Sequence, residues 1–328
     1  MDTRSATNTI AFAFQSMRIE HTFMKKAHLC FDGLRETRRQ ILNIGLGGYE
    51  AKCVTLFADT QSGKTTILKA YLEKNVVDRC YDVGLFSREV PRTLVAALQR
   101  VVVRVSVSGT STLMSLLEDI LRAYGDPRPE TGNMGSKKHR IFRYMQEFRT
   151  ELLIFDEMNH LRIGARGLYQ SAEATRVHNV LKDFLLGGCP IVFVGTTEAQ
   201  AKVLSDFQIR ARCVKSLFLG PLVYGNTEHR RAFTEYCGML GINLMRSGLF
   251  SERSNFLEDD IVPRLFEAAG GYFGHASNIV ELAAHYAKDE GAKRVERCHL
   301  SAAADDYSVL NKLATRNPFE EELELADA

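Results

Sequence analysis

The amino-acid sequence predicts an α/β fold in which helices sandwich a parallel sheet, followed by an all-helical lid. Three observations lead to this prediction. Apolar segments rich in β-branched residues alternate with helical patterns between residues 46 and 220, as in parallel sheets. A glycine-containing loop, residues 58–66, joins the first such segment to a helical pattern. After Pro221 the helical patterns continue and the strand patterns stop.

Composition and charge are those of an ordinary globular chain. Of the 328 residues, 45% are hydrophobic and 25% are charged, which argues against overall disorder. The net charge of +2 is nearly balanced, so any contact with nucleic acid requires a local basic patch. The seven cysteines include no Cys-x-x-Cys pair, which favours a reducing compartment. The apolar run at residues 10–14 is too short for a signal peptide or a membrane span, so we expect a cytoplasmic protein.

The chain divides into four expected regions. An N-terminal helical segment covers residues 1–45, and its helical pattern runs over residues 18–44 until glycines interrupt it. The α/β core covers residues 46–220 and the helical lid residues 221–316. Residues 317–328 are acidic, and we expect a disordered tail there.

The expected elements follow from apolar patterns. Apolar runs predict buried strands at residues 54–57, 101–107, 152–155 and 191–197. A last strand is expected at residues 214–219. Helical spacing predicts core helices from residue 67, at residues 113–124, at residues 141–148 and at residues 177–185. The helix at residues 141–148 is basic, and its expected buried stripe is Ile141, Phe142, Met145 and Phe148. In the lid, helices are expected at residues 232–240, 261–269 and 279–287, and from about Ser301.

The loop at residues 58–66 has the pattern of a phosphate-binding P-loop. Its backbone N–H groups are expected to point at phosphate oxygens, and Gly63 allows the close approach. Lys64 is expected to reach the β- and γ-phosphates of ATP, and the Thr65 hydroxyl to hold Mg²⁺. The alternative is a capped helix start without a ligand. The residues assigned to the nucleotide are Thr60, Gln61, Ser62, Gly63, Lys64, Thr65 and Thr66.

Further polar residues stand where expected strands end. Asp156 and Glu157 follow an apolar strand, and ligands bind at the carboxyl edge of parallel sheets. Asp156 is expected to support Mg²⁺ through water and Glu157 to polarise the attacking water, unless both acids merely cap the next loop or helix. Thr196 or Thr197, at the end of another strand, is expected to hold the water near the γ-phosphate.

Two arginines, Arg210 and Arg212, precede the last expected strand. An arginine placed there is a candidate finger that reaches the nucleotide of a neighbouring subunit. The alternative, a surface arginine in a solvated turn, has equal support from the spacing alone.

The order of these motifs resembles the AAA+ ATPases and, more closely, the TniB/TnsC family, the ATP-dependent regulators of Mu-type transposons. The most telling stretches are Asp156-Glu157-Met158-Asn159-His160-Leu161 and the closing Asn317-Pro318-Phe319. The resemblance covers most of the chain, and its further stretches lie at residues 18–23, 59–66, 121–127 and 190–196.

The resemblance implies a slow, assembly-dependent ATPase with ATP and Mg²⁺ as cofactors. It implies homo-oligomers, as rings or helical filaments on double-stranded DNA, that link a TniQ-like target selector to a DDE transposase. By position, Lys64 and Thr65 hold nucleotide and metal, and Asp156, Glu157 and Thr196 serve hydrolysis. Arg212 is the first candidate for the finger and Arg210 the second.

The sequence departs from the family pattern at two places. Ala58 replaces the first P-loop glycine, and residues 274–277 lack the second-sensor arginine, which suits a switch more than a motor. DNA contacts are assigned to basic residues, for which a solvated surface is the alternative, and His160 is expected to be structural rather than a metal ligand. The assigned DNA contacts are Lys137, Lys138, Arg140, Arg162 and Arg166.

Two other functions remain open on the sequence. A helicase loader shares the ATPase core but is expected to lack the N-terminal helix and the closing Asn-Pro-Phe. A signalling NTPase would recruit protein partners and never touch DNA. Binding to duplex DNA that weakens steeply with salt separates these readings.

Overall fold

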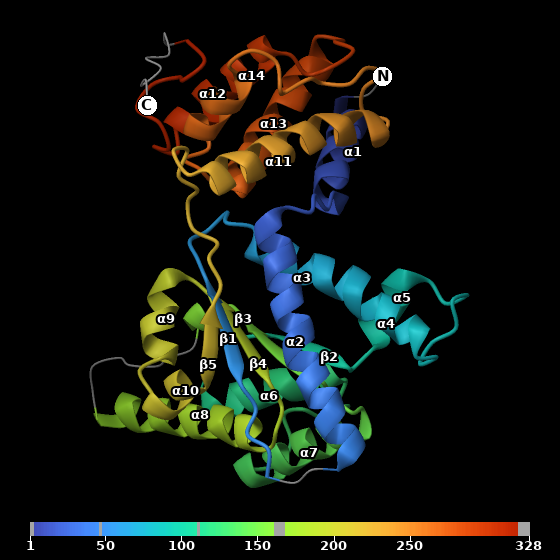
Figure 1. Ribbon diagram of the computed structural model, residues 1–328, viewed down its shortest axis with the longest axis vertical. Coiled ribbons are helices and arrows are strands. Elements are labelled where there is room, and N and C mark those ends of the chain that lie inside the picture. The colour runs from blue at the N-terminus through green and yellow to red at the C-terminus, as the bar shows by residue number, and fades with distance from the viewer. Residues whose placement is uncertain (1–2, 46–47, 110–111, 161–167, 321–328) are drawn as a thin grey trace. The chain divides into compact units, whose positions relative to one another are not determined.

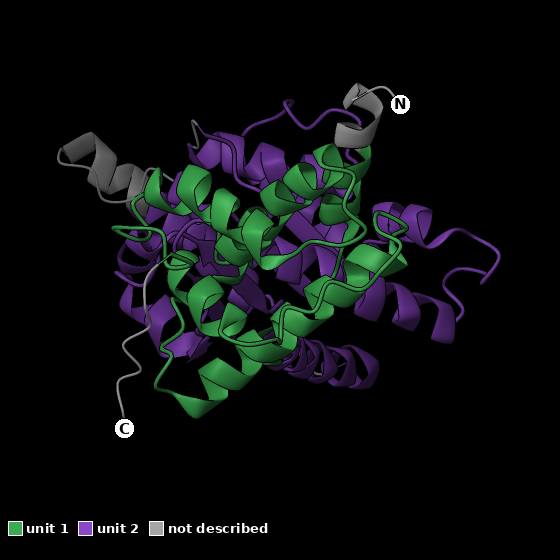
Figure 2. Cartoon of the chain, turned by 90° about the horizontal axis from the view of Figure 1, so that it is seen from above, with its two compact units in different colours: residues 1–24, 61–63, 220–328 green, residues 25–60, 64–219 purple. Residues whose placement is uncertain are grey.

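The computed structural model describes residues 3–45, 48–109, 112–160 and 168–320, and it divides into two compact units. The helical unit comprises residues 1–24, 61–63 and 220–328, and the sheet unit comprises residues 25–60 and 64–219. Figure 2 shows the two units in separate colours. The tip of the P-loop, residues 61–63, therefore groups with the helical unit although the rest of the loop belongs to the sheet unit.

The sheet unit contains a five-stranded parallel sheet in the order β2-β3-β4-β1-β5 (Figure 1). This confirms the predicted parallel sheet. The last strand of the sheet is shorter than expected: it has four residues, of which three pair with β1. The strands are β1 (Cys53–Phe57), β2 (Val102–Ser106), β3 (Leu152–Asp156), β4 (Ile191–Gly195) and β5 (Cys213–Ser216).

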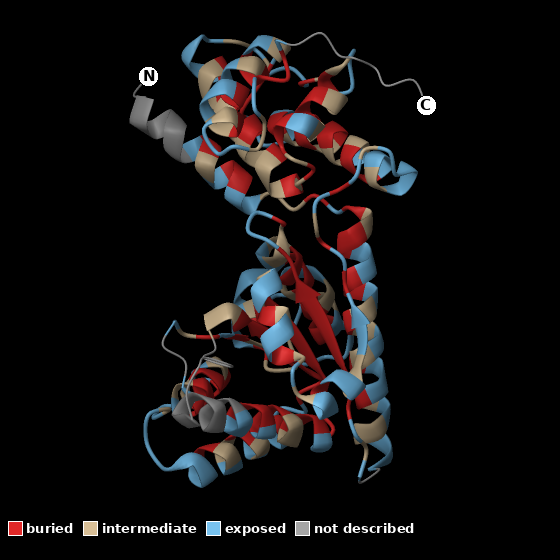
Figure 3. Ribbon diagram, turned by 90° about the vertical axis from the view of Figure 1, so that its left-hand side faces the viewer, coloured by how far each residue is buried: buried red, intermediate tan, exposed pale blue. Residues whose placement is uncertain are grey.

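Helices cover both faces of this sheet. Every residue of the three central strands β1, β3 and β4 is buried, which explains their continuous apolar sequences (Figure 3). On one face, Phe155 and Phe193 stack at 6.2 Å between ring centroids and pack with residues of α6, α7 and α8. On the other face lies α2, whose buried His28 contacts the Ile67 carbonyl oxygen at 3.0 Å.

The helices of the sheet unit agree in order with the sequence pattern. Helix α6 begins at a Thr112 capping box and ends at Gly125, whose φ of 83° is a left-handed conformation that glycine adopts without strain. The helical segments are α2 (Thr22–Ile44), α3 (Lys64–Ala70), η1 (Tyr71–Val76), α4 (Val77–Asp82), α5 (Arg92–Leu98), α6 (Leu113–Tyr124), α7 (Met134–Glu147), η2 (Met158–His160), α8 (Leu168–Leu186), α9 (Thr197–Val203) and α10 (Phe207–Arg212).

The N-terminal segment is two helices rather than the single helix expected over residues 18–44. Helix α1 (Thr3–Ser16) ends before that range, and residues 17–21 are not helical. The imidazole Nδ1 of His21 then accepts a hydrogen bond from the Met24 backbone N–H at 3.3 Å, which caps the start of α2. The first helix belongs to the helical unit, and most of the second belongs to the sheet unit.

The described part of the helical unit contains no strand. The last helix begins at Arg297, four residues before the expected Ser301, because Glu296 and His299 form a capping box there. Besides α1, its elements are α11 (Thr227–Arg246), α12 (Ile261–Ala268), α13 (Phe273–Asp289), α14 (Arg297–Ala303) and η3 (Ala304–Val309).

The closing Asn-Pro-Phe packs onto these helices, although the expected tail begins at residue 317. The amide Nδ2 of Asn317 donates to the Ser301 carbonyl at 3.0 Å and to an Asp305 carboxylate oxygen at 2.8 Å. Phe319 is 2% exposed, and the Arg297 guanidinium donates to its carbonyl oxygen at 2.7 Å. These contacts hold residues 317–319 in place, and the expected disorder of residues 321–328 lies outside the described part of the chain.

Two features of the described residues concern membranes and disulfides. No helix of the described residues is long and apolar enough to cross a bilayer. All seven cysteines are free thiols, as expected for a chain without a disulfide framework.

Candidate nucleotide-binding site

The P-loop connects the carboxyl end of β1 to the start of α3. Two of its residues have left-handed backbones, Gln61 with φ 59° and Gly63 with φ 89°. The strand before the loop is buried, whereas Thr60, Gln61 and Thr65 are exposed. Such a turn presents backbone N–H groups outward, which is the arrangement that a phosphate requires.

Lys64 begins α3 and turns back onto the loop. Its ammonium group donates to the carbonyl oxygens of Ala58 at 2.7 Å and Asp59 at 2.5 Å. Burial lowers the pKa of Lys64 from its usual range, whereas the negative charges of Asp156 and Asp59 act in the opposite direction. The amine is therefore held over the loop, and the Asp156 charge acts on it from β3.

Asp156 ends β3 and has both carboxylate oxygens engaged. Its side chain is 5% exposed, and Oδ1 accepts the backbone N–H of Glu157 at 3.0 Å. The other oxygen, Oδ2, accepts two hydrogen bonds from the Arg104 guanidinium on β2, at 3.1 Å from Nε and 2.6 Å from an amino nitrogen. The buried carboxylate is thus neutralised by a cation of the neighbouring strand.

Glu157 projects from a left-handed backbone with φ 61°, which is unusual for a residue with a side chain. Its carboxylate accepts a hydrogen bond from the Ser106 hydroxyl at 2.9 Å, and Ser106 pairs with Asp156 in the strand register. His160 contacts the Val107 carbonyl oxygen through Nδ1 at 3.0 Å, which agrees with its expected structural role. The exposed acid is therefore held by a serine at the carboxyl edge of the sheet.

The two threonines after β4 have different roles. Thr196 is the residue before α9 and stands at the carboxyl edge beside β1. The Thr197 hydroxyl instead donates to the Asp59 carboxylate, which connects α9 to the P-loop. Thr196 thus lies at the carboxyl edge of the sheet, where its binding of water stays a prediction, and Thr197 contacts the loop.

The residues present are suitable for Mg²⁺. Asp156 and Thr65 supply a carboxylate and a hydroxyl oxygen, the hard donors that this ion prefers. These two residues would hold the ion, which would neutralise phosphate charge when bound. Arg104 is bound to Oδ2 of Asp156, so the guanidinium and an ion held here would draw on the same carboxylate. Among the described residues, no cluster of histidine, cysteine and carboxylate side chains suits a different metal site.

Within the helical unit, the start of α13 lies against the tip of the P-loop. A Cβ atom built on Gly274 would stand 2.1 Å from the Gln61 carbonyl oxygen, which no side chain can tolerate. Gly274 occurs in the stretch where the sequence lacks a second-sensor arginine. The absence of a side chain there allows direct backbone contact.

Arg210 and Arg212 lie on α10 rather than in a turn, and only Arg210 is free of an ion pair among the described residues. Arg212 donates to the Glu50 carboxylate at 2.6 Å, and its side chain is 14% exposed. Arg210 is exposed and lies over the Phe207 ring, whose own exposure is 71%. The structure thus makes Arg210, the second candidate by sequence, the arginine that is available to a neighbour.

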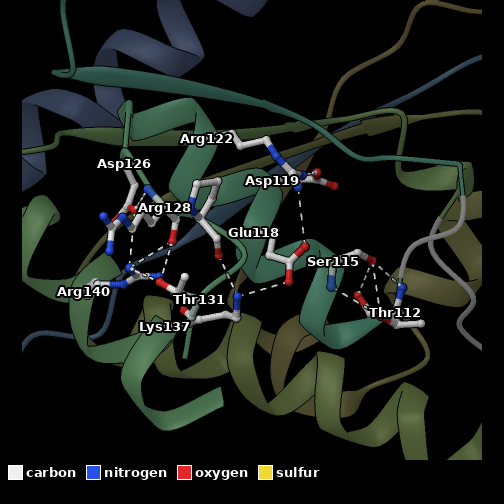
Figure 4. A network of polar contacts seen from close by, with 11 residues as sticks. Thr112, Ser115, Glu118, Asp119, Arg122, Asp126, Arg128, Thr131, Lys137 and Arg140 are labelled. Atoms are coloured by element: carbon white, nitrogen blue, oxygen red, sulfur yellow. Dashed lines mark hydrogen bonds and ion pairs between the residues drawn. The ribbon is translucent and has the colours of Figure 1, made fainter. Parts of the chain in front are cut away.

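The basic helix α7 differs from the expected DNA-binding surface, because its first lysine faces inward (Figure 4). Lys137 is fully buried, and its ammonium donates to Glu118 at 3.1 Å and to the Pro129 carbonyl at 2.6 Å. Arg140 lies at 3.4 Å from the buried Asp126 and donates to backbone carbonyls of its loop, including that of Thr131 at 3.0 Å. Both side chains hold a loop in place, and the buried Lys137 is not accessible to DNA.

The other assigned DNA contacts have mixed outcomes. Lys138 forms an ion pair with Asp183 on α8, so it is also engaged. Arg162 and Arg166 lie outside the described residues. Phe148, expected in the buried stripe of this helix, is 41% exposed because it follows the last helical residue.

Sequence reasoning missed Arg104 and Ser106. Both lie on β2, the strand beside β3, and the register places Ser106 directly opposite Asp156. The available signal was the polar pair within a β-branched run, since ends of adjacent parallel strands meet at one edge. Strand order is not visible in a sequence, so these partners could not be assigned.

Comparisons with known proteins agree with this geometry. Residues 48–203 match a family described as an AAA domain. No curated protein matches the sequence.

Solved structures with a similar fold include three proteins of low sequence identity. The Aeropyrum pernix ORC1 protein, solved in complex with DNA, is 16% identical with a TM-score of 0.55, and the match covers 90% of this chain and 68% of that one. The Aeropyrum pernix ORC2 protein, in ADPNP and ADP complexes, is 14% identical with a TM-score of 0.55, covering 84% and 66%. Cdc6p from Pyrobaculum aerophilum is 15% identical with a TM-score of 0.57, covering 90% and 70%.

The chain spans about two thirds of the length of these proteins. At such identities the likeness concerns the fold. Residues 48–203 thus match an AAA domain, and the chain shares the AAA+ P-loop fold seen in ORC and Cdc6 proteins.

Proposed function

We propose that this chain is an ATP-controlled regulator of DNA transposition that assembles on double-stranded DNA. In this role ATP and Mg²⁺ bind at the P-loop, copies associate head to tail, and the assembly links a TniQ-like target selector to a DDE transposase. The observation that carries the proposal is the set of catalytic groups at one sheet edge, combined with an exposed arginine on α10. That combination suits hydrolysis completed by a neighbouring copy.

The chain's own residues have separate tasks in this mechanism. Loop N–H groups and Lys64 bind the phosphates, which requires the ammonium to leave the carbonyls of Ala58 and Asp59. Glu157, held by Ser106, is placed to accept a proton from the attacking water. In this mechanism Arg210 of one copy stabilises the phosphate charge in the next.

DNA association is supported by the sequence resemblance and by the shared fold, since the similar ORC1 protein was solved with DNA. Because α7 uses its first lysine internally, the proposal assigns DNA contact to Arg162 and Arg166. Contacts of this kind bind phosphates with little sequence readout, and their affinity depends on salt.

A salt titration with duplex DNA tests the proposal. The full chain is titrated with labelled duplex in the presence of ADP or a non-hydrolysable ATP analogue, and the same samples are imaged by electron microscopy. We expect ATP-dependent rings or filaments whose DNA affinity falls at least about tenfold between low and physiological salt. A chain that stays monomeric beside DNA with either nucleotide would contradict the proposal.

Glu157→Gln provides the matched variant. It should bind ATP normally and remain assembled, since it keeps the Ser106 partner but cannot accept a proton. Rapid disassembly of this variant would exclude Glu157 as the base. ATP-dependent assembly without DNA binding would favour a signalling NTPase instead.

A further inference from the structure

A groove lies at the opposite edge of the sheet from the P-loop. It has a volume of about 550 Å³ and is lined by residues that precede β2 and β3, including Arg100 and Glu151. The backbone N–H of Glu151 donates to the Val101 carbonyl at 2.7 Å, which closes the floor between the two strand starts. Its volume lies in the range of sites that bind small ligands or short peptides. Nothing in the proposed ATPase mechanism uses it.

The groove walls are apolar and accessible. Leu85 is 56% exposed, Leu98 is 52% exposed, and Phe148 is 41% exposed, and all three line the same groove. Single exposed apolar side chains are common on protein surfaces, but a group of them around one depression is typical of a binding site. The walls therefore favour an occupant that has apolar side chains of its own.

The rim is positive, because its arginines outnumber their carboxylate partners. Glu151 is already bound by Arg39 at 2.9 Å and by the buried Arg35 at 2.8 Å. Glu147 pairs with Arg143, which lies outside the groove lining. Both acids that line the groove are thus neutralised.

Three further arginines line the groove without a carboxylate within ion-pair distance among the described residues: Arg79, Arg100 and Arg149. Arg149 donates to the Asn43 amide oxygen at 2.7 Å, and Arg100 donates to backbone carbonyls such as that of Tyr124 at 3.1 Å. Burial lowers the pKa of Arg100, as expected for a half-buried cation that lacks a counter-charge.

An occupant that suits these features combines several carboxylates with apolar side chains. Duplex DNA supplies the charge, but its phosphate backbone gains nothing from exposed leucine and phenylalanine. The chain itself contains a suitable segment at residues 320–328, which has two leucines and no basic residue. Its carboxylates are Glu320, Glu321, Glu322, Glu324 and Asp327.

We propose that this groove binds the acidic segment, residues 320–328, of a second copy of the chain. The carboxylates contact the rim arginines, and Leu323 and Leu325 pack against the exposed apolar walls. The segment follows Phe319, which is anchored in the helical unit, so each copy presents it from a fixed start. The inference rests on the proposed function only for the presence of a neighbouring copy.

A peptide of residues 317–328 tests the proposal without nucleotide or DNA, so its result is separate from that of the ATPase proposal. The labelled peptide is titrated into the full chain that carries Leu323→Ser and Leu325→Ser, which leaves the groove open. We expect saturable binding that weakens as salt rises from about 50 mM to about 500 mM, because rim charges are screened. Replacing every acid of the peptide by its amide should weaken binding about tenfold or more.

Groove variants locate the binding. Arg79→Glu and Leu98→Ser should each reduce peptide affinity about tenfold, since the first repels the acids and the second removes apolar contact. Arg88→Glu is the matched control, because Arg88 is exposed, pairs with Asp82 and does not line the groove. Equal peptide affinity in Arg79→Glu and Arg88→Glu, or equal binding of a scrambled peptide, would overturn the proposal.

Discussion

The two edges of the sheet use their charged residues in opposite ways. At the carboxyl edge, Lys64 and Arg104 are held by oxygens of the same unit, and Asp156 has both oxygens engaged. At the amino edge, Arg79 and Arg210 are exposed cations without a carboxylate partner among the described residues. One edge is internally neutralised and the other is open to an acidic neighbour.

This difference shows how a head-to-tail assembly can divide its chemistry. A site that is neutralised within one copy is stable alone and reacts only when a ligand displaces the internal contacts. Cations left without partners gain most from a second molecule, because their charge is not yet compensated.

The largest effect is expected at Arg210. If this exposed arginine completes the neighbour's site, Arg210→Ala should reduce assembly-dependent ATP hydrolysis by roughly a thousandfold. Turnover is measured with saturating duplex DNA, and assembly is followed separately by light scattering. Mixing the variant with Glu157→Gln subunits should restore part of the activity, since each variant supplies what the other lacks.

Arg212→Ala is the matched control for that experiment. Its pairing with Glu50 predicts a loss of thermal stability rather than of turnover per assembled copy. A thousandfold loss of turnover in Arg212→Ala but not in Arg210→Ala would reverse the assignment of the finger.

At the carboxyl edge, Lys64→Ala should lower ATP affinity by about 10- to 100-fold, because a charge-assisted hydrogen bond to phosphate is removed. Equilibrium binding of a fluorescent ATP analogue measures this loss. Binding of the 317–328 peptide at the other edge should not change. Loss of both ligands together would indicate unfolding and not a local effect.

A moderate effect is expected for Arg104→Ala. Removing the guanidinium leaves the buried Asp156 without its partner, so the melting temperature without metal should fall. Added Mg²⁺ should recover part of this loss in the variant and have little effect on the wild type, since the carboxylate becomes free for the ion. A variant that Mg²⁺ does not stabilise would argue against competition between Arg104 and the metal at Asp156.

The smallest effect concerns pH. Burial lowers the pKa of His178 on α8, and Asp206 only partly opposes this shift. The folded-state pKa is below the unfolded value of about 6.5, so the unfolded chain binds more protons as the pH falls. The stability that neutral, buried His178 contributes is fully present above about pH 6.5, the unfolded pKa. It is lost as the pH drops toward the lower pKa of the folded state.

Urea unfolding midpoints measured above and below the unfolded histidine pKa report this change of stability with pH. His178→Gln should make the midpoint depend less on pH. None of the described residues that line the groove is a histidine. Peptide affinity at the groove should therefore change less with pH than the urea midpoint does. A larger change in peptide affinity would contradict the contrast between the two edges of the sheet.

The sequence predicted the framework of the carboxyl edge because local patterns encode it. A buried strand followed by Gly63 and Lys64, and an apolar run ending in Asp156 and Glu157, each describe a short continuous piece of chain. The all-parallel sheet followed from the alternation of such pieces. What remained hidden depends on strand order, as with Arg104, whose partner is 52 residues away.

The amino edge was not predictable for the same physical reason. Its groove combines residues of α2, α4, α5 and the turn after α7, which no periodic pattern relates. The basic character of α7 was visible, but the inward direction of Lys137 was not, because it depends on where Glu118 and Pro129 lie. Charge in a sequence indicates composition, and only packing decides which charges face solvent.

The burial of Lys137 has a practical consequence for mapping surfaces by charge removal. An alanine at this position leaves Glu118 and the Pro129 carbonyl without their donor and opens a cavity beside α6. If the chain binds DNA as proposed, the variant would lose that binding by unfolding part of the domain, and a scan scored by activity would count Lys137 as a contact. A protease-resistance assay on each variant distinguishes loss of folding from loss of a surface contact. The Lys137 variant is the control that is expected to lose folding.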